Sequence, residues 1–239
     1  MNYTTDILIL SDLHLGSRHA DTARLLKSIA EIKPKRLVLL GDIVDIFKKN
    51  RGHWKWGSEE DSVIQWITNL NAEVVFIVGN HDESYIPPFN CEICTETYYT
   101  TPNGDKYLLL HGHLFDAEYL KNNPMLYKIG DFLYDMVLDI SSAFSLDKFK
   151  IPAIIKSRVK YITNFVNTYQ KDLAKYAVEK SCMGIVSGHI HWPEASYVTA
   201  PGLNQPLIHY LNSGSWIRGE HSSYVIEVNG SLVLKVTGE

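Results

Sequence analysis

The sequence lacks the features that mark several large classes of protein. Three cysteines, with Cys182 far from the other two, are too few for a disulfide framework. No apolar run approaches the roughly 20 residues that span a bilayer, and the first residues lack the basic and apolar segments of a signal peptide. The net charge of −4 gives no general reason to expect nucleic acid. We therefore expect a cytoplasmic protein that binds no nucleic acid.

The length and composition fit one globular domain. The chain has 239 residues, of which 45% are hydrophobic and 21% are charged, as in an ordinary soluble protein with a sizeable core. No internal repeat and no low-complexity stretch divides it. We expect residues 1–239 to form a single domain of the α/β class.

Five short apolar runs recur along the chain, and they end at Leu10, Leu40, Val78, Leu110 and Val186. Runs of consecutive aliphatic residues are typical of strands that are buried on both faces, as in a parallel sheet beneath helices. Between the first two runs, apolar residues at helical spacing predict a helix from about Asp21 to Ile32, which Pro34 would end. The chain thus opens with a β-α-β unit, which should be right-handed.

The remaining apolar segments predict further strands. Leu207 to Leu211, Tyr224 to Val228 and Leu232 to Val236 are interpreted as strands of a second sheet. Cys91 to Cys94 is a lone C-x-x-C with alternating neighbours, which favours an edge strand over a zinc or redox site.

Each of the five apolar runs is followed by residues that can bind a metal ion. In chain order these residues are Asp12 and His14, Asp42, Asn80, His111, and finally His189 and His191. Side chains two residues apart at a strand end point to the same side, and ligands bind outside the carboxyl ends of the strands in open α/β sheets. A single Asp or His there is usually a turn residue. The fivefold recurrence indicates a metal site.

The donor set suits two metal ions better than one. Seven Asp, Asn and His residues are too many for one tetrahedral zinc ion, and they fit two divalent ions about 3.5–4 Å apart. Two carboxylates and a bridging hydroxide would leave such a pair with a charge of about +1, which attracts an anionic phosphate. Manganese, iron, cobalt and zinc all accept these donors.

Two segments fall outside this regular pattern. The loop from His53 to Gly57 places two Trp residues beside Lys55, either to stack a base or cover the site, or to pack on the body as a surface loop. Residues 116–180 carry two apolar stripes at helical spacing, which predict a helical lid over the strand ends. The alternative is that the stripes pack on each other or on the body. The stripes are Met125, Ile129, Phe132, Leu133 and Met136, then Ile155, Val159, Ile162, Val166 and Tyr169.

The blocks D-x-H, GD-x-x-D, GNHD, H-G-H and G-H-x-H resemble, in this order, those of the calcineurin-like metallophosphoesterases, from Asp6 to about Trp216. The resemblance implies two packed mixed β-sheets flanked by helices. It also implies two metal ions, with manganese the expected metal, that share Asp42 as a bridge. One ion would be held by Asp12, His14, Asp42 and His191, and the other by Asp42, Asn80, His111 and His189. His81 would not be a ligand, but would contact the phosphoryl group beside Asn80 or protonate the leaving oxygen.

The segment 116–180 is similar to the insertion of the UDP-2,3-diacylglucosamine diphosphatase branch, which serves lipid A biosynthesis. The similarity lies in Ile129-Gly-Asp-Phe132, Tyr134-Asp135 and the basic residues Lys156, Arg158 and Lys160. By this resemblance the insertion is a lid over acyl chains and nucleotide, its basic residues lie near the diphosphate or the membrane surface, and the protein contacts the inner membrane peripherally.

The sequence departs from that branch at two positions. The best-known subfamily has Arg where His81 stands and Asp where His113 stands. One alternative function is a phosphodiesterase or phosphatase for soluble nucleotides or other small phosphate esters. The other is a binding scaffold like the phosphoesterase-like subunit of retromer, against which the complete ligand set argues.

Overall fold

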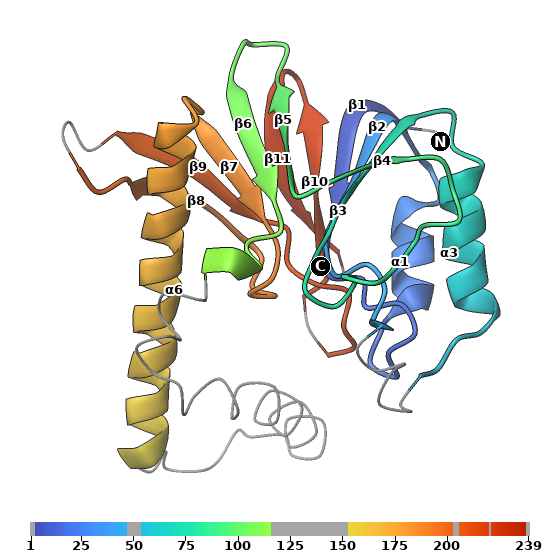
Figure 1. The fold of residues 1–239 in the computed structure, drawn as a ribbon, viewed down its shortest axis with the longest axis horizontal. Helices are drawn as coiled ribbons and strands as arrows, with labels where there is room; N and C mark the ends of the chain where they lie inside the picture. The colour runs from blue at the N-terminus through green and yellow to red at the C-terminus, as the bar shows by residue number, and fades with distance from the viewer. Residues whose placement is uncertain (1–2, 47–53, 116–152, 203–205, 220, 238–239) are drawn as a thin grey trace.

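The structure is a computed structural model that describes residues 3–46, 54–115, 153–202, 206–219 and 221–237 (Figure 1). For residues 153–165 only the backbone is described. The described strands form two sheets of six and five strands. Two helices cover the outer side of the first sheet and one long helix covers the second, so that the predicted arrangement of two packed mixed sheets between helices is confirmed.

The first sheet has the strand order β11-β10-β1-β2-β3-β4. Strands β1 to β4 are parallel, and β10 and β11 continue the sheet in antiparallel pairing. The bounds are β1 Tyr3–Leu10, β2 Ile32–Leu40, β3 Glu73–Ile77, β4 Glu92–Cys94, β10 Ser223–Val228 and β11 Ser231–Val236, with helices α1 Thr22–Ile29 and α3 Ser58–Thr68 between them.

The second sheet has the order β5-β6-β7-β9-β8, in which β6, β7 and β9 are parallel and the two edge strands are antiparallel to their neighbours. The bounds are β5 Glu96–Thr100, β6 Lys106–Leu110, β7 Gly184–Ser187, β8 Glu194–Thr199 and β9 Leu207–Asn212. A short 3-10 helix, η1 (His113–Phe115), follows β6, and the long helix α6 (Ala153–Glu179) precedes β7.

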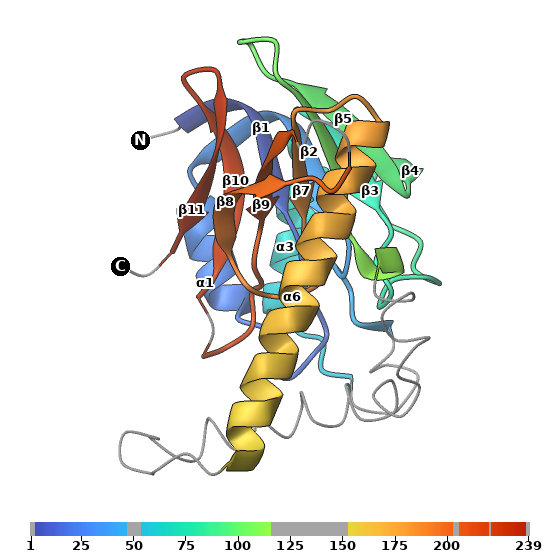
Figure 2. The ribbon, with the colours of Figure 1, turned by 90° about the vertical axis from the view of Figure 1, so that its left-hand side faces the viewer.

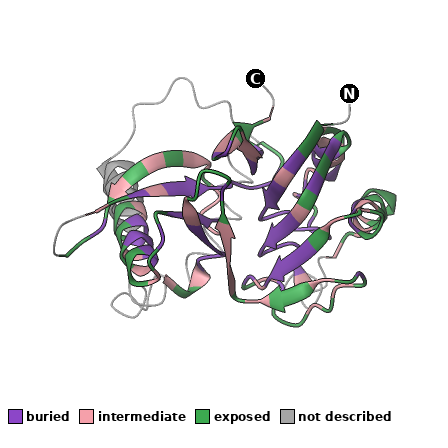
Figure 3. Ribbon diagram, turned by 90° about the horizontal axis from the view of Figure 1, so that it is seen from above, coloured by how far each residue is buried: buried purple, intermediate pink, exposed green. Residues whose placement is uncertain are grey.

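Alternate residues of the aliphatic strands serve two different cores, which explains why the runs are continuous. Ile9 and Leu40 face the second sheet and pack with Leu109 and Val186. Their neighbours on the same strands, such as Leu39, face α1 and α3 instead. Figure 3 shows the resulting burial along the strands of both sheets.

Two predictions about the first β-α-β unit are wrong in detail. The helix ends at Ile29, and Ile32 begins strand β2, so Pro34 lies inside a strand instead of ending a helix. Pro34 is opposite Thr5 of β1, while β3 pairs with β2 only from Arg36 onward. Because one edge of β2 has no strand partner at Pro34, the missing N–H costs no ladder hydrogen bond there.

The assignment of the last three strands to a second sheet is also wrong for two of them. Only β9 joins the second sheet, whereas β10 pairs with β1, with Leu8 opposite Ile226, and β11 pairs with β10. Val225 and Ile226 lie on opposite faces of the first sheet: Val225 packs in the core between the sheets, and Ile226 packs in the core beneath α1 and α3. In contrast, the edge-strand interpretation of the C-x-x-C segment is confirmed, because β4 ends the first sheet and both cysteines are free.

Helix α6 belongs partly to the body of the protein. Tyr169, Leu173, Ala174 and Ala177 are buried in its C-terminal half and pack on the outer face of the second sheet. Its N-terminal half extends past the ends of the sheets (Figures 1 and 2). Residues 116–152 lie outside the described residues, so the helical lid stays a prediction. The alternative, that the apolar residues pack on the body of the protein, holds for the C-terminal half of α6.

A network of polar groups fixes the end of α6 against the edge strand β5. The ammonium group of Lys180 lies 2.8 Å from Oε1 of Glu96, and the hydroxyl of Tyr176 donates to Oε2 of the same carboxylate at 2.8 Å. These groups are partly exposed, and exposed ion pairs contribute little to stability. The apolar contacts of the helix therefore supply most of its attachment.

Candidate metal centre

The loops that follow β1, β2, β3, β6 and β7 meet at one edge of the two sheets, as the sequence predicts. Backbone hydrogen bonds join them directly. The amide of Asp12 donates to the carbonyl of Gly41 at 3.0 Å, and the amide of His14 donates to the carbonyl of Asp42 at 3.0 Å. On the second sheet the amide of Gly188 donates to the carbonyl of His111 at 3.1 Å. The loops thus form one connected unit.

Five of the seven candidate ligands have a left-handed backbone, with φ of 51° at Asp12, 47° at His14, 53° at Asp42, 71° at His189 and 55° at His191. Among the other described residues that are not glycine, only Ser181 and Asn229 share this conformation. Such a conformation costs a side-chain-bearing residue of order 1–3 kcal/mol and persists where the surroundings enforce it. Its concentration in these loops makes them the candidate functional site.

The first group of donors comprises Asp12, His14 and His191, whose donor atoms lie within 4.8 Å of one another. Nε2 of His191 is 3.2 Å from Oδ1 of Asp12, and the Nε2 atoms of His14 and His191 are 3.1 Å apart. Two nitrogen ligands about 2.1 Å from one ion have a similar separation in tetrahedral geometry. The three side chains can hold a single divalent ion.

The second group comprises Asp42, His111 and His189. Nε2 of His111 lies 3.3 Å from Oδ2 of Asp42, is buried, and has no hydrogen-bond partner. The other ring nitrogen, Nδ1, donates to the carbonyl of Leu40 at 2.9 Å. When the ring carries a single proton, this bond keeps that proton on Nδ1 and leaves the lone pair on Nε2 free for a metal ion, which is how a metal-binding histidine is usually held. The group therefore fits a second ion.

The pKa values of the buried groups show a strongly negative site. Burial raises the pKa of Asp12 and Asp42, but the nearby histidines outweigh it and leave both pKa values below the usual range. For His111, burial lowers the pKa, whereas the negative charge of the nearby Asp42 carboxylate outweighs burial and raises it to about 10 overall. Both carboxylates are therefore ionised, and a divalent cation would supply the positive charge that they attract.

Asn80 is the candidate ligand that the structure supports least directly. It lies in the turn between Gly79 and His81 and is exposed. The amide of His81, the next residue, donates to Oδ1 of Asp42 at 2.9 Å, so the turn is fixed beside the proposed bridge. Ligation by the Asn80 side chain stays a prediction.

Asp45 is a site residue to which the sequence reasoning gave no role. Its side chain is 2% exposed, with Oδ1 at 3.1 Å from Nδ1 of His81 and Oδ2 at 3.7 Å from Nδ1 of His14. Burial raises its pKa, but the hydrogen bonds from His14 and His81 lower it to well below its usual range. Asp45 is therefore an anion that orients both rings, and its sequence signal was the second Asp of the GD-x-x-D block.

Asp82 is the second residue that the sequence reasoning missed. Its buried carboxylate accepts three backbone hydrogen bonds, from Asp42 at 2.8 Å, Val44 at 2.8 Å and Gly79 at 3.0 Å. Burial and the charge of Asp42 raise its pKa to about 7, against the lowering effect of the backbone donors. The carboxylate joins the loop after β2 to the loop after β3. A Cβ on Gly79 would overlap Asp42, which explains the glycine of the GNHD block.

The loop with two Trp residues packs on the body. The ring of Trp54 lies against Gly16 and is stacked on Trp56, with centroids 5.1 Å apart and planes at 6°. The amide of Lys55 donates to the carbonyl of Gly16 at 2.8 Å. This arrangement supports the loop that carries Asp12 and His14, whereas His53 lies outside the described residues.

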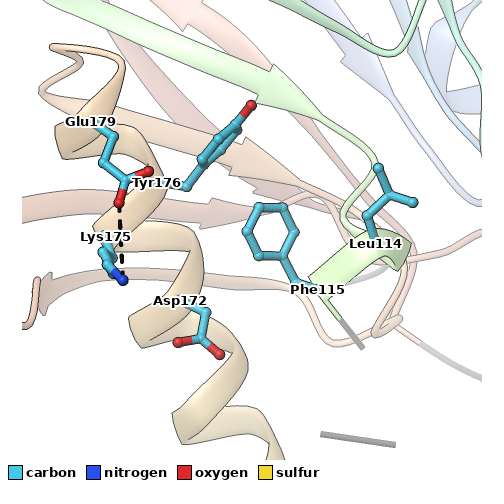
Figure 4. Close-up of a pocket in the computed structure, with 6 residues that line it drawn as sticks. All are labelled: Leu114, Phe115, Asp172, Lys175, Tyr176 and Glu179. Carbon is cyan, nitrogen blue, oxygen red and sulfur yellow. Dashed lines mark ion pairs between the residues drawn. The ribbon is translucent and has the colours of Figure 1, made fainter. Parts of the chain in front are cut away.

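The predicted substrate-binding residues Lys156, Arg158 and Lys160 lie on the N-terminal part of α6, where only the backbone is described. Their roles stay predictions. A separate cavity of about 250 Å³ lies between η1 and α6, and none of the candidate ligands lines it (Figure 4). Its walls are Leu114, Phe115, Asp172, Lys175, Tyr176 and Glu179.

Comparison with known proteins agrees with this fold and supports a hydrolase of the phosphoesterase class. Residues 5–193 match the model of the calcineurin-like phosphoesterase family. The match covers most of the sequence, so the chain belongs to this family, and the resemblance seen in the sequence is confirmed. A curated relative, the UDP-2,3-diacylglucosamine hydrolase of Ectopseudomonas mendocina (strain ymp), is 21% identical over an alignment of 235 residues, which covers 94% of this chain and 94% of that one.

Solved structures of similar proteins are more distant. The phosphoesterase Yfce from E. coli is 18% identical, with a TM-score of 0.48 over 97% of this chain and 96% of that one. Vps29 complexed with Zn²⁺ from Entamoeba histolytica is 14% identical, with a TM-score of 0.46 over 97% of both chains. Likenesses this remote carry no argument about activity.

We predict that Asp42→Ala releases both metal ions. Asp42 lies beside His111 of the second donor group and accepts a hydrogen bond from the turn that carries Asn80. Its backbone carbonyl also accepts the amide of His14, which belongs to the first donor group. Metal content per chain, measured by plasma mass spectrometry, should fall from two ions to none after dialysis. The matched control is Asp6→Ala in the middle of β1, which removes an ion pair with Lys35 and should keep two ions. An Asp42→Ala protein that still holds two ions would contradict the shared-ligand arrangement.

Proposed function

We propose that this protein is a dinuclear metal phosphohydrolase that cleaves the diphosphate of UDP-2,3-diacylglucosamine into UMP and a lipid sugar phosphate. The observation that carries the hydrolase part is the cluster of candidate ligands in left-handed backbone conformations at one edge of the sheets. The name of the relative from Ectopseudomonas mendocina and the insertion with its basic residues support the lipid-linked substrate.

Two divalent ions at this site would supply Lewis-acid chemistry, which withdraws charge from the phosphoryl group and makes water a better nucleophile. The protein contributes the ligands and their rigid placement. Asp12, His14 and His191 would hold one ion, Asn80, His111 and His189 the other, and Asp42 would bridge them. Manganese is the proposed metal, although these donors also accept iron, cobalt and zinc.

His81 is placed to act on the leaving group. Its side chain is 22% exposed, so the ring reaches the solvent side of the site, while Nε2 lies 3.9 Å from Oδ2 of Asp42. Nδ1 faces Asp45, whose negative charge stabilises the protonated ring. A ring held in this way can donate the proton on Nε2 to the departing oxygen. We propose that Asp45 orients this acid and stabilises its charge.

The basic residues Lys156, Arg158 and Lys160 complete the proposal for the substrate. They lie on the half of α6 that extends past the sheets (Figures 1 and 2). In this proposal they bind the diphosphate or an anionic membrane surface, and the contact with the membrane is peripheral. None of the helices that the structure describes has the length and apolarity needed to cross a membrane.

We predict that His81→Ala keeps both metal ions but lowers kcat about 10²–10⁴-fold, the range for loss of a general acid. Asp45→Asn should lower kcat in the same direction by a smaller factor, because the ring remains but its charge is less stabilised. Glu83→Ala, two residues away on the exposed part of the same turn, serves as the control and should leave kcat unchanged. Loss of metal from His81→Ala with intact fold would make His81 a ligand and refute its assignment as an acid.

The substrate is tested by a direct comparison of an acylated and an unacylated nucleotide sugar. With Mn²⁺ present, kcat/KM for UDP-2,3-diacylglucosamine should exceed that for UDP-N-acetylglucosamine by well over tenfold, because each buried methylene contributes about 0.8 kcal/mol. Mass spectrometry of the products should show UMP. Equal rates on both compounds would favour a phosphodiesterase of soluble nucleotides over a lipid enzyme.

A further inference from the structure

Tyr169 lies between the two loops that carry the histidines of the second donor group. It is 2% exposed and comes from the middle of α6. The centroid of its ring is 6.3 Å from that of His189, and its hydroxyl lies against Gly112, the neighbour of His111. One side chain of the helix therefore contacts both loops.

The next residue on α6 makes a second link to the same loop. The side-chain amide of Gln170 donates to Oε2 of Glu194 at 2.7 Å, and Gln170 is 8% exposed. Ile190, between the two candidate ligands of this loop, packs in the same apolar cluster as Tyr169. Two consecutive residues of the helix thus hold the segment 189–194 at both of its ends.

This segment needs external support because its backbone is strained. His189 and His191 have φ of 71° and 55°, and Gly112 in the facing loop has φ of 109°. On the side of the first sheet the amide of His189 donates to the carboxylate of Asp12 at 3.1 Å. Strained conformations persist only where the surroundings over-determine them. Helix α6 adds contacts to the segment through Tyr169 and Gln170.

We propose that Tyr169 is a positioning residue for the second metal site. Its ring fills the space between residues 111–113 and 188–191 and keeps the rings of His111 and His189 directed at Asp42. The role explains why a glycine separates the two histidines of the H-G-H block, since a Cβ on Gly112 would overlap the hydroxyl of Tyr169. The proposal rests on the metal pair of the proposed function and is independent of which substrate is cleaved.

The test measures metal binding rather than turnover. Metal-free protein is titrated with Mn²⁺, and electron paramagnetic resonance separates the spectrum of a coupled ion pair from that of a single ion. Tyr169→Ala should bind the second ion at least tenfold more weakly, so an ion concentration that saturates the original protein gives the single-ion spectrum. Tyr169→Phe keeps the ring and should bind the second ion within about twofold of the original affinity.

The control is Tyr176→Ala, two turns further along α6. Tyr176 bonds to Glu96 and packs on Phe115, with ring centroids 5.4 Å apart, and it contacts none of the candidate ligands. Its loss should lower the thermal midpoint of unfolding while the coupled-pair spectrum is kept. Two ions bound by Tyr169→Ala at the original affinity would overturn the proposal, as would equal weakening by Tyr176→Ala.

A double substitution tests the contact with Gly112 even where Tyr169→Ala does not fold. Gly112→Ala alone should weaken the second ion, because the new methyl meets the tyrosine hydroxyl. In the Tyr169→Phe background the nearest ring atom, Cζ, is 3.1 Å from that methyl, so the loss should be smaller. The strain at φ of 109° is common to both backgrounds and cancels. An equal loss in both would overturn the contact. Normal metal binding without cleavage of any nucleotide would refute the proposed function alone.

Discussion

The buried carboxylate of Asp82 is the constraint on which the rest of the site depends. By accepting the amides of Asp42, Val44 and Gly79, it joins the ends of two parallel strands. A carboxylate in an apolar interior is costly unless its oxygens are satisfied by donors, so its position is sharply defined. Asp42 is fixed by that position in a left-handed conformation, and the turn of Asn80 and His81 is fixed beside it. The residue that most determines the geometry is therefore not one of the candidate ligands.

The same principle extends to the whole centre, where strained ligand loops are enclosed by elements that have no strain of their own. Trp54 supports the loop of Asp12 and His14 through Gly16, and Tyr169 and Gln170 of α6 support the loop of His189 and His191. Donors held in this way need little rearrangement when a cation binds, so little binding free energy is lost to reorganisation of the protein. Helix α6 thus carries both the basic residues proposed for the substrate and the residues that contact the loops of the candidate metal site.

Much of this site follows from the sequence, and the reasons for the successes and failures are physical. The carboxyl ends of parallel strands meet at one edge, so polar residues after five apolar runs had to gather there. Asp45 and Asp82 escaped notice because an Asp in a turn has many uses, and the geometry of the turn alone shows which amides it accepts. The sequence also could not predict that β10 and β11 belong to the first sheet, since the pattern of a buried strand does not indicate which strand it pairs with. Tyr169 looked like one member of an apolar stripe, and its contact with Gly112 appears only once the helix is placed on the sheet.

The central claim is that two divalent ions share Asp42 on this rigid scaffold. Crystals grown with Mn²⁺ and measured at the manganese absorption edge would locate the ions directly by anomalous scattering. The account predicts two peaks per chain, about 3.5–4 Å apart, with Asp42 between them, one beside His14 and His191 and the other beside His111 and His189. A single peak, or an ion bound instead among His14, Asp45 and His81, would contradict it.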